Sequence, residues 1–377
     1  MVLNVLHLTH TDVRIDSRIL KEMNSLATTL HCSVTGIGID RDRDLAANDP
    51  GTITLEAIDL IARKLRFVPG PVRQALAMLE YSARVVFRAA RSRPDVVHCH
   101  DTGVLPVGAV LRLLFGAKLI YDTHELESDR NGISPAIGKV ILRLEKLLWR
   151  LVDGLVVVSP SIEDWYAQHV GPKRTAVVLN SPVFAPFDDV RGDDYLRRTF
   201  PIDADSKAFI YVGNLVVGRG VELVLDAFQR EDVDSAVVFM GRGELQGAVE
   251  DAAARSHNIF FHEAVPHEEV VAVTRSADVG LCLIENVSLS DYHCLPNKLF
   301  EYCFAGIPVL ASDFPDIAAT VEQYRLGICC ALDADEIHRG IGAFERGEVS
   351  ADFADLTRLG WLAQADELCR LYRDIVT

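Results

Sequence analysis

The stretch Ser290 to Ser312, SDYHCLPNKLFEYCFAGIPVLAS, decides the fold, because it joins two strand-like runs through a polar turn and a helix. Before it, Val279 to Ile284 is short, apolar and branched, as expected for a buried parallel strand. Pro296 suits a first helical turn, and apolar residues follow at helical spacing until a glycine and a proline end the helix. Val309 begins the next strand. This order is typical of an α/β domain with a parallel sheet.

The polar residues of this turn indicate a binding site. Lys298 and Glu301 lie three residues apart and therefore share one face of the first helical turn, where exposed backbone N–H groups favour an anion. Loops at the carboxyl ends of parallel strands often bind ligands. We expect a phosphorylated ligand at this helix start. An ordinary ion pair on the helix surface is the alternative.

A second loop has the composition of a phosphate site. In residues 211–220, YVGNLVVGRG, Gly213, Gly218 and Gly220 let backbone N–H groups approach a phosphate, and Arg219 can donate two hydrogen bonds to its oxygens. The spacing is neither that of a Walker loop nor that of the dinucleotide fingerprint. We expect a pyrophosphate here. A plain glycine turn with a solvated arginine is the alternative.

Length and charge limit the class of protein. The chain has 377 residues, enough for two domains, and its formal net charge of -16 argues against nucleic acid as a partner. No apolar stretch is long enough to span a membrane, and no basic region precedes an apolar stretch at the N-terminus. The eight cysteines lie mostly in apolar runs without a Cys-x-x-Cys pair, as reduced core residues do. We expect a cytoplasmic protein.

Strand-like and helix-like runs alternate along the chain, which predicts an α/β fold with two Rossmann-like domains and a cleft between them. Prolines and charged residues break the pattern between 181 and 205. We expect an acceptor domain at 1–185, a donor domain at 186–359 and a terminal helix at 360–377, where apolar residues recur at helical spacing.

Two segments combine Lys and Arg with large apolar residues. They are Ile61 to Arg73, IARKLRFVPGPVR, and Lys139 to Arg150, KVILRLEKLLWR. Either could lie on an anionic membrane surface, which would place the protein at the inner face of the membrane. The alternative is a surface helix that packs one face on the core and presents its basic residues to water.

These segments together resemble the retaining nucleotide-sugar glycosyltransferases of the GT-B fold, the group 1 glycosyltransferases, which carry two glutamates separated by seven residues. Glu301 matches the second glutamate, and the helix-Gly-x-Pro-Val pattern follows it. His293 stands in the position of the first glutamate, and a subgroup that carries Pro-Asn-Lys-Leu-Phe-Glu-Tyr has a polar residue there. The resemblance implies two Rossmann-like domains with parallel sheets that face across a cleft. It also implies a C-terminal helix that returns to the N-terminal domain.

The resemblance further implies transfer of a sugar from a nucleotide diphosphate, with UDP expected from its frequency in the family, to an acceptor hydroxyl with retention of anomeric configuration. Arg219 and Lys298 would stabilise the leaving diphosphate, His124 would orient the reacting sugar, and Glu301 would bind the ribose. No metal is expected, because these cations can neutralise the diphosphate and the Asp-x-Asp run at 40–42 lies in the acceptor half. The remaining donor-binding residues are Gly213, Asn214, Gly218, Gly241, Gly243, Val265, His293, Leu295, Pro296 and Asn297.

In the acceptor half, His100 and His124 follow strands and are expected to face the crevice, although strand-end histidines are often structural. Many family members carry a Gly-Gly pair in the first loop, where this chain has Asp-Ser-Arg at 16–18. We expect Arg14 and Arg18 to hold an anionic acceptor such as a lipid diphosphate, beside His100. The expected partners are a nucleotide sugar and an acceptor glycan or lipid-linked sugar, with synthesis of a polysaccharide or glycolipid as the setting.

Two other functions fit the same two-domain architecture, because a fold does not fix a reaction. One is a sugar-nucleotide epimerase or hydrolase, which would interconvert or cleave the donor without an acceptor. The other is a non-catalytic nucleotide-sugar binding protein, which the histidine at position 293 would favour.

Overall fold

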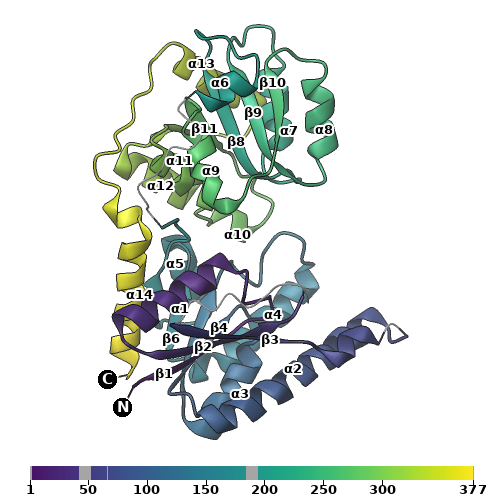
Figure 1. The fold of residues 1–377 in the computed structure, drawn as a ribbon, viewed down its shortest axis with the longest axis vertical. Helices are drawn as coiled ribbons and strands as arrows, with labels where there is room; N and C mark the ends of the chain where they lie inside the picture. The colour runs from purple at the N-terminus through teal and green to yellow at the C-terminus, as the bar shows by residue number, and fades with distance from the viewer. Residues whose placement is uncertain (1, 42–51, 66, 184–193, 377) are drawn as a thin grey trace. The chain divides into compact units, whose positions relative to one another are not determined.

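A computed structural model of the chain describes residues 2–41, 52–65, 67–183 and 194–376, and Figure 1 labels most of its helices and strands. The described chain forms two compact units. Unit 1 holds the residues up to Val178 together with those from Gln364 onward, and unit 2 holds Leu179–Ala363. The expected boundary at 185–186 lies outside the described residues. The two units are described separately below.

Unit 1 contains a parallel seven-stranded sheet with the order β3-β2-β1-β4-β5-β6-β7. Short loops and helices connect the strands, as in a doubly wound α/β domain. The strands are β1 (Asn4–Leu8), β2 (Ser33–Ile39), β3 (Ile53–Ile58), β4 (Val96–His100), β5 (Lys118–Thr123), β6 (Gly154–Val157) and β7 (Arg174–Val177). The helices are α1 (Ser17–Thr29), η1 (Ile61–Lys64), α2 (Gly70–Ser92), α3 (Leu105–Phe115), α4 (Pro135–Leu148), η2 (Trp149–Leu151) and α5 (Pro160–His169).

Unit 2 contains a parallel six-stranded sheet with the order β10-β9-β8-β11-β12-β13. Its strands are β8 (Ala208–Asn214), β9 (Ala236–Arg242), β10 (Ile259–Glu263), β11 (Val279–Cys282), β12 (Val309–Ser312) and β13 (Gly327–Cys330). Its helices are α6 (Tyr195–Thr199), α7 (Val221–Phe228), α8 (Gln246–Ala253), α9 (His267–Thr274), α10 (Leu289–Tyr292), α11 (Asn297–Ala305), α12 (Pro315–Tyr324), α13 (Ala334–Glu345) and η3 (Thr357–Leu359). The expected α/β fold with two Rossmann-like domains is confirmed.

The strand β4 shows how the sequence places polar groups inside unit 1. It is buried along its whole length, which is typical of a central parallel strand covered on both faces. His98 and His100 therefore lie inside the unit, where their ring nitrogens must find hydrogen-bond partners within the protein. The residues that supply those partners form the unit 1 part of the candidate site.

The last helix, α14 (Trp361–Val376), packs on unit 1, as expected for the terminal segment. The Tyr372 hydroxyl lies 2.8 Å from His98 Nδ1. A Cβ atom on Gly154, the first residue of β6, would overlap the Ile375 side chain, so the helix lies directly against the sheet. The C-terminal residues thus complete the core of the unit that the N-terminal residues begin.

The sequence analysis missed two strands, β3 and β13. Each is at the edge of its sheet and has mixed burial, so its pattern lacks the continuous apolar run of a central strand. Four other strands, β1, β6, β7 and β11, were expected at 4–9, 154–159, 176–179 and 279–284 and end one or two residues earlier. Ser159 is the N-cap of α5, with its hydroxyl accepting a hydrogen bond from the Ile162 amide, and β11 stops at Cys282. None of the helices in the described part of the chain combines the length and apolar character needed to cross a membrane.

Candidate functional site

In unit 2, the loops after β8, β9 and β11 lie at the carboxyl ends of parallel strands. The loop after β8 begins at Gly213, which has a φ of 127°, and continues through Gly218 and Gly220, with φ values of 85° and 74°. Side chains other than glycine rarely adopt these angles. A Cβ atom on Gly213 would lie 3.8 Å from Lys298 Nζ, so the backbone of this loop passes close to the amine. The expected glycine loop and the expected lysine therefore lie together.

Lys298 is a buried cation, and no ion pair joins it to another residue in the described part of the chain. Its side chain is on α11, and Nζ lies 3.8 Å from the centre of the Tyr211 ring. Among the described residues Nζ has no hydrogen-bond partner. Burial lowers the pKa of Lys298 to about 8, although the charge of Glu301 acts in the opposite direction. A bound anion would supply the missing partner and raise this pKa.

Glu301 and the start of α11 complete this side of the site. Glu301 is buried one turn after Lys298 on the same helix. Pro296 is the N-cap residue and provides no side-chain hydrogen bond to the first turn of α11. A helix start without such a cap favours an anion through its free N–H groups. Around this start, Leu295 is buried, His293 is half-buried and Asn297 is exposed.

Arg219 and the start of α7 already bind carboxylates of unit 2. Arg219 Nη1 lies 3.1 Å from Asp291 Oδ1, and the Ser288 hydroxyl donates a hydrogen bond to the other oxygen of Asp291. The Gly220 amide donates to Glu285 Oε1 at 3.0 Å. Lys298, by contrast, has no such partner among the residues that the structure describes. Sequence reasoning missed Asp291 and Glu285, because only the folded sheet brings their loop beside the glycine loop.

The other expected glycines have a packing role in the structure. A Cβ atom on Gly241 would overlap the Gly213 carbonyl oxygen, and one on Gly243 would overlap the Leu215 carbonyl oxygen. Gly243 also has a φ of 158°. The end of β9 therefore approaches the backbone that follows β8. Val265 lies between β10 and α9 and is half-buried.

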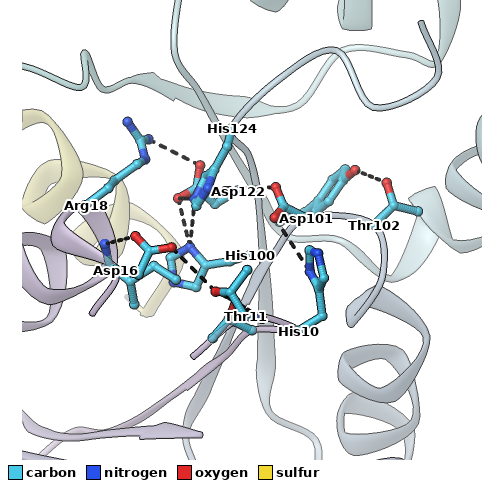
Figure 2. Close-up of polar contacts among 12 residues, drawn as sticks. His10, Thr11, Asp16, Arg18, His100, Asp101, Thr102, Asp122 and His124 are labelled. Carbon is cyan, nitrogen blue, oxygen red and sulfur yellow. Dashed lines mark hydrogen bonds and ion pairs between the residues drawn. The ribbon is translucent and has the colours of Figure 1, made fainter. Parts of the chain in front are cut away.

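In unit 1, one carboxylate organises the ends of β4 and β5 (Figure 2). Asp122 Oδ2 lies 3.1 Å from His100 Nδ1 and 3.3 Å from His124 Nε2, while Asp122 Oδ1 accepts a hydrogen bond from Arg18 at 3.3 Å. On its other side, His124 Nδ1 lies 3.8 Å from Asp101 Oδ1. The sequence-predicted residues His100, His124 and Arg18 thus form one cluster.

The charges in this cluster favour an imidazolium at His124. Burial lowers the pKa of His124, but the carboxylates of Asp101 and Asp122 outweigh that effect and raise the pKa to about 10. Burial likewise raises the pKa of Asp122, but Arg18 and His124 outweigh it and hold that pKa well below its usual range. His124 is therefore a hydrogen-bond donor at neutral pH, and about a fifth of its side chain, 21%, is exposed.

The sequence matches two family models of glycosyltransferase domains. Residues 40–181 match the glycosyl transferase 4-like domain, and residues 206–344 match the glycosyl transferases group 1 domain. The chain belongs to the group 1 glycosyltransferases. Glycogen synthase from Mycobacterium tuberculosis is 25% identical over 295 residues, which cover 76% of this chain and 67% of that protein.

The solved structures of other proteins superimpose on this group 1 glycosyltransferase over almost its whole length. Sucrose-phosphate synthase from Thermosynechococcus elongatus superimposes with a TM-score of 0.79 at 17% identity, and the match covers 99% of both chains. HepE from Anabaena, solved in complex with UDP-glucose, has a TM-score of 0.75 at 15% identity and matches 99% of this chain and 100% of its own. At such identities the similarity establishes the GT-B fold.

Arg14 and Arg18 are neutralised inside the glycosyltransferase. Arg14 Nη2 lies 2.7 Å from Asp12 and 2.7 Å from Asp40, while Arg18 pairs with Glu22 at 3.0 Å and donates to the Val178 carbonyl. Arg18 is only 3% exposed. Their charge thus stabilises carboxylates of unit 1, and their expected role in holding an anionic acceptor stays a prediction.

A buried group in unit 1 places possible metal ligands close together. His7, Glu22, His98 and His100 each offer one atom within 4.8 Å of the others. The His98 ring, however, stacks on those of His7 and His100 with interplanar angles of 26° and 13°. A metal ion must lie in the plane of each imidazole that binds it, and nearly parallel stacked planes do not meet at one ion. We interpret this group as a hydrogen-bonded network. Residue 42 of the Asp-x-Asp run lies outside the described residues.

Proposed function

We propose that the chain transfers a sugar from a nucleotide diphosphate, UDP in the first instance, to an acceptor hydroxyl with retention of anomeric configuration. The observation that carries this proposal is the buried Lys298 amine, which lies beside the Gly213 backbone without a hydrogen-bond partner among the described residues. Such an amine is poised to bind an anionic oxygen. UDP is favoured because HepE, a protein of the same fold, has been solved with UDP-glucose.

In this proposal the chemistry depends on charge stabilisation in unit 2. As the bond between sugar and phosphate lengthens, negative charge develops on the leaving diphosphate, and a fixed cation stabilises that state more than the ground state. Lys298 supplies this cation. Arg219 supplies a second when a phosphate displaces the Asp291 carboxylate from it. With two cations in place, a metal ion is not needed for neutralisation, and Glu301 accepts hydrogen bonds from the ribose.

His124 has the second role in the proposal. As an imidazolium it donates hydrogen bonds, and it is neither a base nor a nucleophile at neutral pH. We assign to it the orientation of the donor sugar through hydroxyl groups. The Asp122 carboxylate, shared with His100, holds the ring in place.

The setting that we propose is synthesis of a polysaccharide or glycolipid at the inner face of the membrane, in the cytoplasm. Unit 1 carries exposed apolar side chains on and near α2, including Phe67, Leu79 and Phe87, which are 83%, 67% and 59% exposed. Residues 61–93 contain eight Lys and Arg residues and one Glu, in a chain whose net charge is -16. This combination fits an anionic lipid surface. Co-sedimentation with anionic vesicles would detect it, and absence of binding at low salt would contradict it.

The donor site is tested first by thermal shift with UDP, GDP and ADP on the wild type and on Lys298→Met. A ligand at a hundred times its dissociation constant adds about 2.7 kcal/mol to the stability of the folded state. We expect a base-selective shift in the wild type and little or none in the variant, because the buried cation is lost while the stem keeps its length. Lys207→Met, at an exposed lysine of unit 2, is the control that should keep the shift.

Analysis of the reaction products then distinguishes a transferase from an epimerase or a hydrolase. Transfer to an acceptor with retained configuration, followed by proton NMR of the anomeric centre, supports the transferase. Interconversion or acceptor-independent cleavage of the sugar nucleotide would indicate the epimerase or hydrolase instead. Absence of a thermal shift with every nucleotide would contradict the donor site itself.

A further inference from the structure

We propose that a cationic pocket in unit 1 binds the phosphate or diphosphate group of an amphiphilic acceptor. The pocket has a volume of about 580 Å³ and lies at the carboxyl ends of β1, β2 and β3, beside the start of α2. This inference rests on the proposed function, because it names the acceptor class of that reaction. The described lining residues are His10, Ile39, Arg41, Leu60, Arg63, Gly70, Arg73, Gln74, Ala77 and Met78.

The charge of the pocket is positive and uncompensated within the described residues. Arg41, Arg63 and Arg73 line it together with His10, and the described lining includes no carboxylate. Where the structure describes the chain, none of the three arginines forms an ion pair. Among the described residues, the guanidinium groups of Arg41 and Arg63 donate to the backbone carbonyls of His10 and Asp40, at 3.4 Å each. Guanidinium groups in this state bind phosphate oxygens through paired hydrogen bonds.

The rest of the lining is apolar. Ile39, Leu60 and Ala77 present small exposed parts of otherwise buried side chains, and Met78 is half-buried. Outside the pocket, Val72 and Leu76 on α2 are 51% and 38% exposed. An apolar chain attached to the phosphate would therefore find apolar contacts in the pocket and at its rim. The lining thus favours an amphiphilic anion over a free phosphate.

The pocket also lies beside the cluster that holds His124. His10 Nδ1 lies 3.7 Å from Asp101 Oδ2, and the other oxygen of Asp101 faces His124 Nδ1 at 3.8 Å. One carboxylate therefore contacts both a pocket-lining residue and the histidine that we assign to the reacting sugar, as Figure 2 shows. An acceptor whose phosphate occupies the pocket would be held next to that histidine.

The same geometry explains why the pocket, and not the first loop, is the site for an anion. Arg14 and Arg18 are paired with carboxylates, whereas the three pocket arginines are not paired within the described chain. Binding a phosphate at Arg14 would require breaking two ion pairs. Binding at Arg63 and Arg73 breaks none among the described residues.

The test is titration calorimetry with farnesyl diphosphate, inorganic pyrophosphate and farnesol as probes, on the wild type, Arg63→Ala/Arg73→Ala and Arg91→Ala. Arg91 is the matched control, because it is on α2 but stacks on Phe87 away from the pocket. We expect farnesyl diphosphate to bind the wild type at least tenfold more tightly than pyrophosphate does, and farnesol to bind more weakly still. The double variant should weaken farnesyl diphosphate binding at least tenfold, and the control less than twofold.

Three results would overturn the proposal. They are unchanged binding of farnesyl diphosphate by the double variant, equal binding of farnesyl diphosphate and farnesol, and equal binding of farnesyl diphosphate and pyrophosphate. The last result would show that the apolar lining contributes nothing. Circular dichroism and thermal unfolding of the same samples confirm that the double variant is folded. Because the titration needs neither donor nor turnover, its failure is distinguishable from failure of the proposed transferase.

Discussion

At the scale of single residues, Lys298 has two properties that each destabilise its charged form. A buried ammonium is destabilised by loss of water, and this one also lacks a hydrogen-bond acceptor among the described residues. The effect is visible in its pKa, which burial lowers to about 8. Its folded-state pKa lies below the usual value, so the amine is increasingly neutral as the pH rises above 8. The charge needed for a diphosphate is then lost.

We predict that UDP affinity falls with rising pH through this pKa. In the free protein about nine-tenths of the Lys298 amines are protonated one pH unit below the pKa and about one-tenth one unit above it, so the dissociation constant should rise by up to tenfold between pH 7 and 9. Lys298→Arg should remove most of this dependence, because a guanidinium stays protonated. Calorimetric titration of UDP at pH 7, 8 and 9 provides the measurement. Parallel pH profiles for both proteins would show that another group controls binding.

The sequence predicted which residues share the donor site better than it predicted which side chains pair with them. It predicted that Lys298, Glu301 and the glycine loop belong to one site, because helix and turn spacing are local properties. It did not predict that Asp291 pairs with Arg219, or that Arg18 is buried against Glu22 and Asp122. Those contacts join residues far apart in the chain, and their existence depends on strand order and side-chain packing. For Arg14 and Arg18 the acceptor role stays a prediction, and the carboxylates that pair with them could not be predicted from the sequence.

At the scale of elements, the Tyr372 hydroxyl connects α14 to the candidate site. Tyr372 contacts His98 Nδ1, and the His98 ring stacks on that of His100 with ring centres 4.5 Å apart. His100 in turn shares Asp122 with His124. If the Tyr372 hydroxyl donates to His98 Nδ1, the proton of the His98 ring lies on Nε2. That nitrogen is 3.6 Å from an Asp122 oxygen. With that order of donors, the terminal helix sets the tautomer of a histidine beneath the site.

We predict that Tyr372→Phe destabilises the protein by about 1–3 kcal/mol, because it leaves a buried ring nitrogen without its partner. The measurement is urea unfolding followed by fluorescence and circular dichroism. Arg370→Ala, on the same helix but solvent-exposed and paired with Glu367, should change stability by less than about 0.5 kcal/mol. Equal stability of Tyr372→Phe and the wild type would mean that the hydroxyl contributes nothing to docking of the helix.

The regular elements were largely predictable, and their exceptions have physical causes. Central strands such as β4 and β12 appear as continuous apolar runs, and their predicted bounds agree with the structure. The edge strand β3 contains Thr54 and Glu56 and has only two buried residues, so its pattern resembles a polar loop. The pocket above β3 was missed for the same reason. A strand that is not predicted cannot direct attention to the residues at its end.

At the scale of the whole molecule, the charge is unevenly distributed along the chain. The net charge is -16, yet residues 61–93 carry a local excess of seven positive charges, from eight Lys and Arg and one Glu. Several exposed large apolar side chains lie in the same segment. An acidic protein is repelled by an anionic surface as a whole, so any attraction must come from this region and must act at short range.

We predict salt-sensitive binding to vesicles of phosphatidylglycerol and phosphatidylcholine, and no binding to phosphatidylcholine alone. Raising the salt from 50 to 500 mM shortens the screening length to a few ångströms and should reduce the bound fraction several-fold. Phe67→Ser/Leu79→Ser should weaken binding at low salt, whereas Leu362→Ser, an equally exposed apolar residue on α14, should not. Vesicle co-sedimentation provides the measurement. Binding that is insensitive to both salt and lipid charge would contradict the electrostatic part of the proposal.

The packing of α14 also determines the order in which the chain can fold during translation. Residues up to Val178 leave the ribosome first, but the face of β6 at Gly154 stays uncovered until Ile375 has emerged. Unit 2 is continuous in sequence and can fold while unit 1 still waits for its last helix. A stalled or prematurely terminated nascent chain would therefore expose the apolar surface of unit 1, which makes this incomplete half the natural target for chaperones and quality-control proteases.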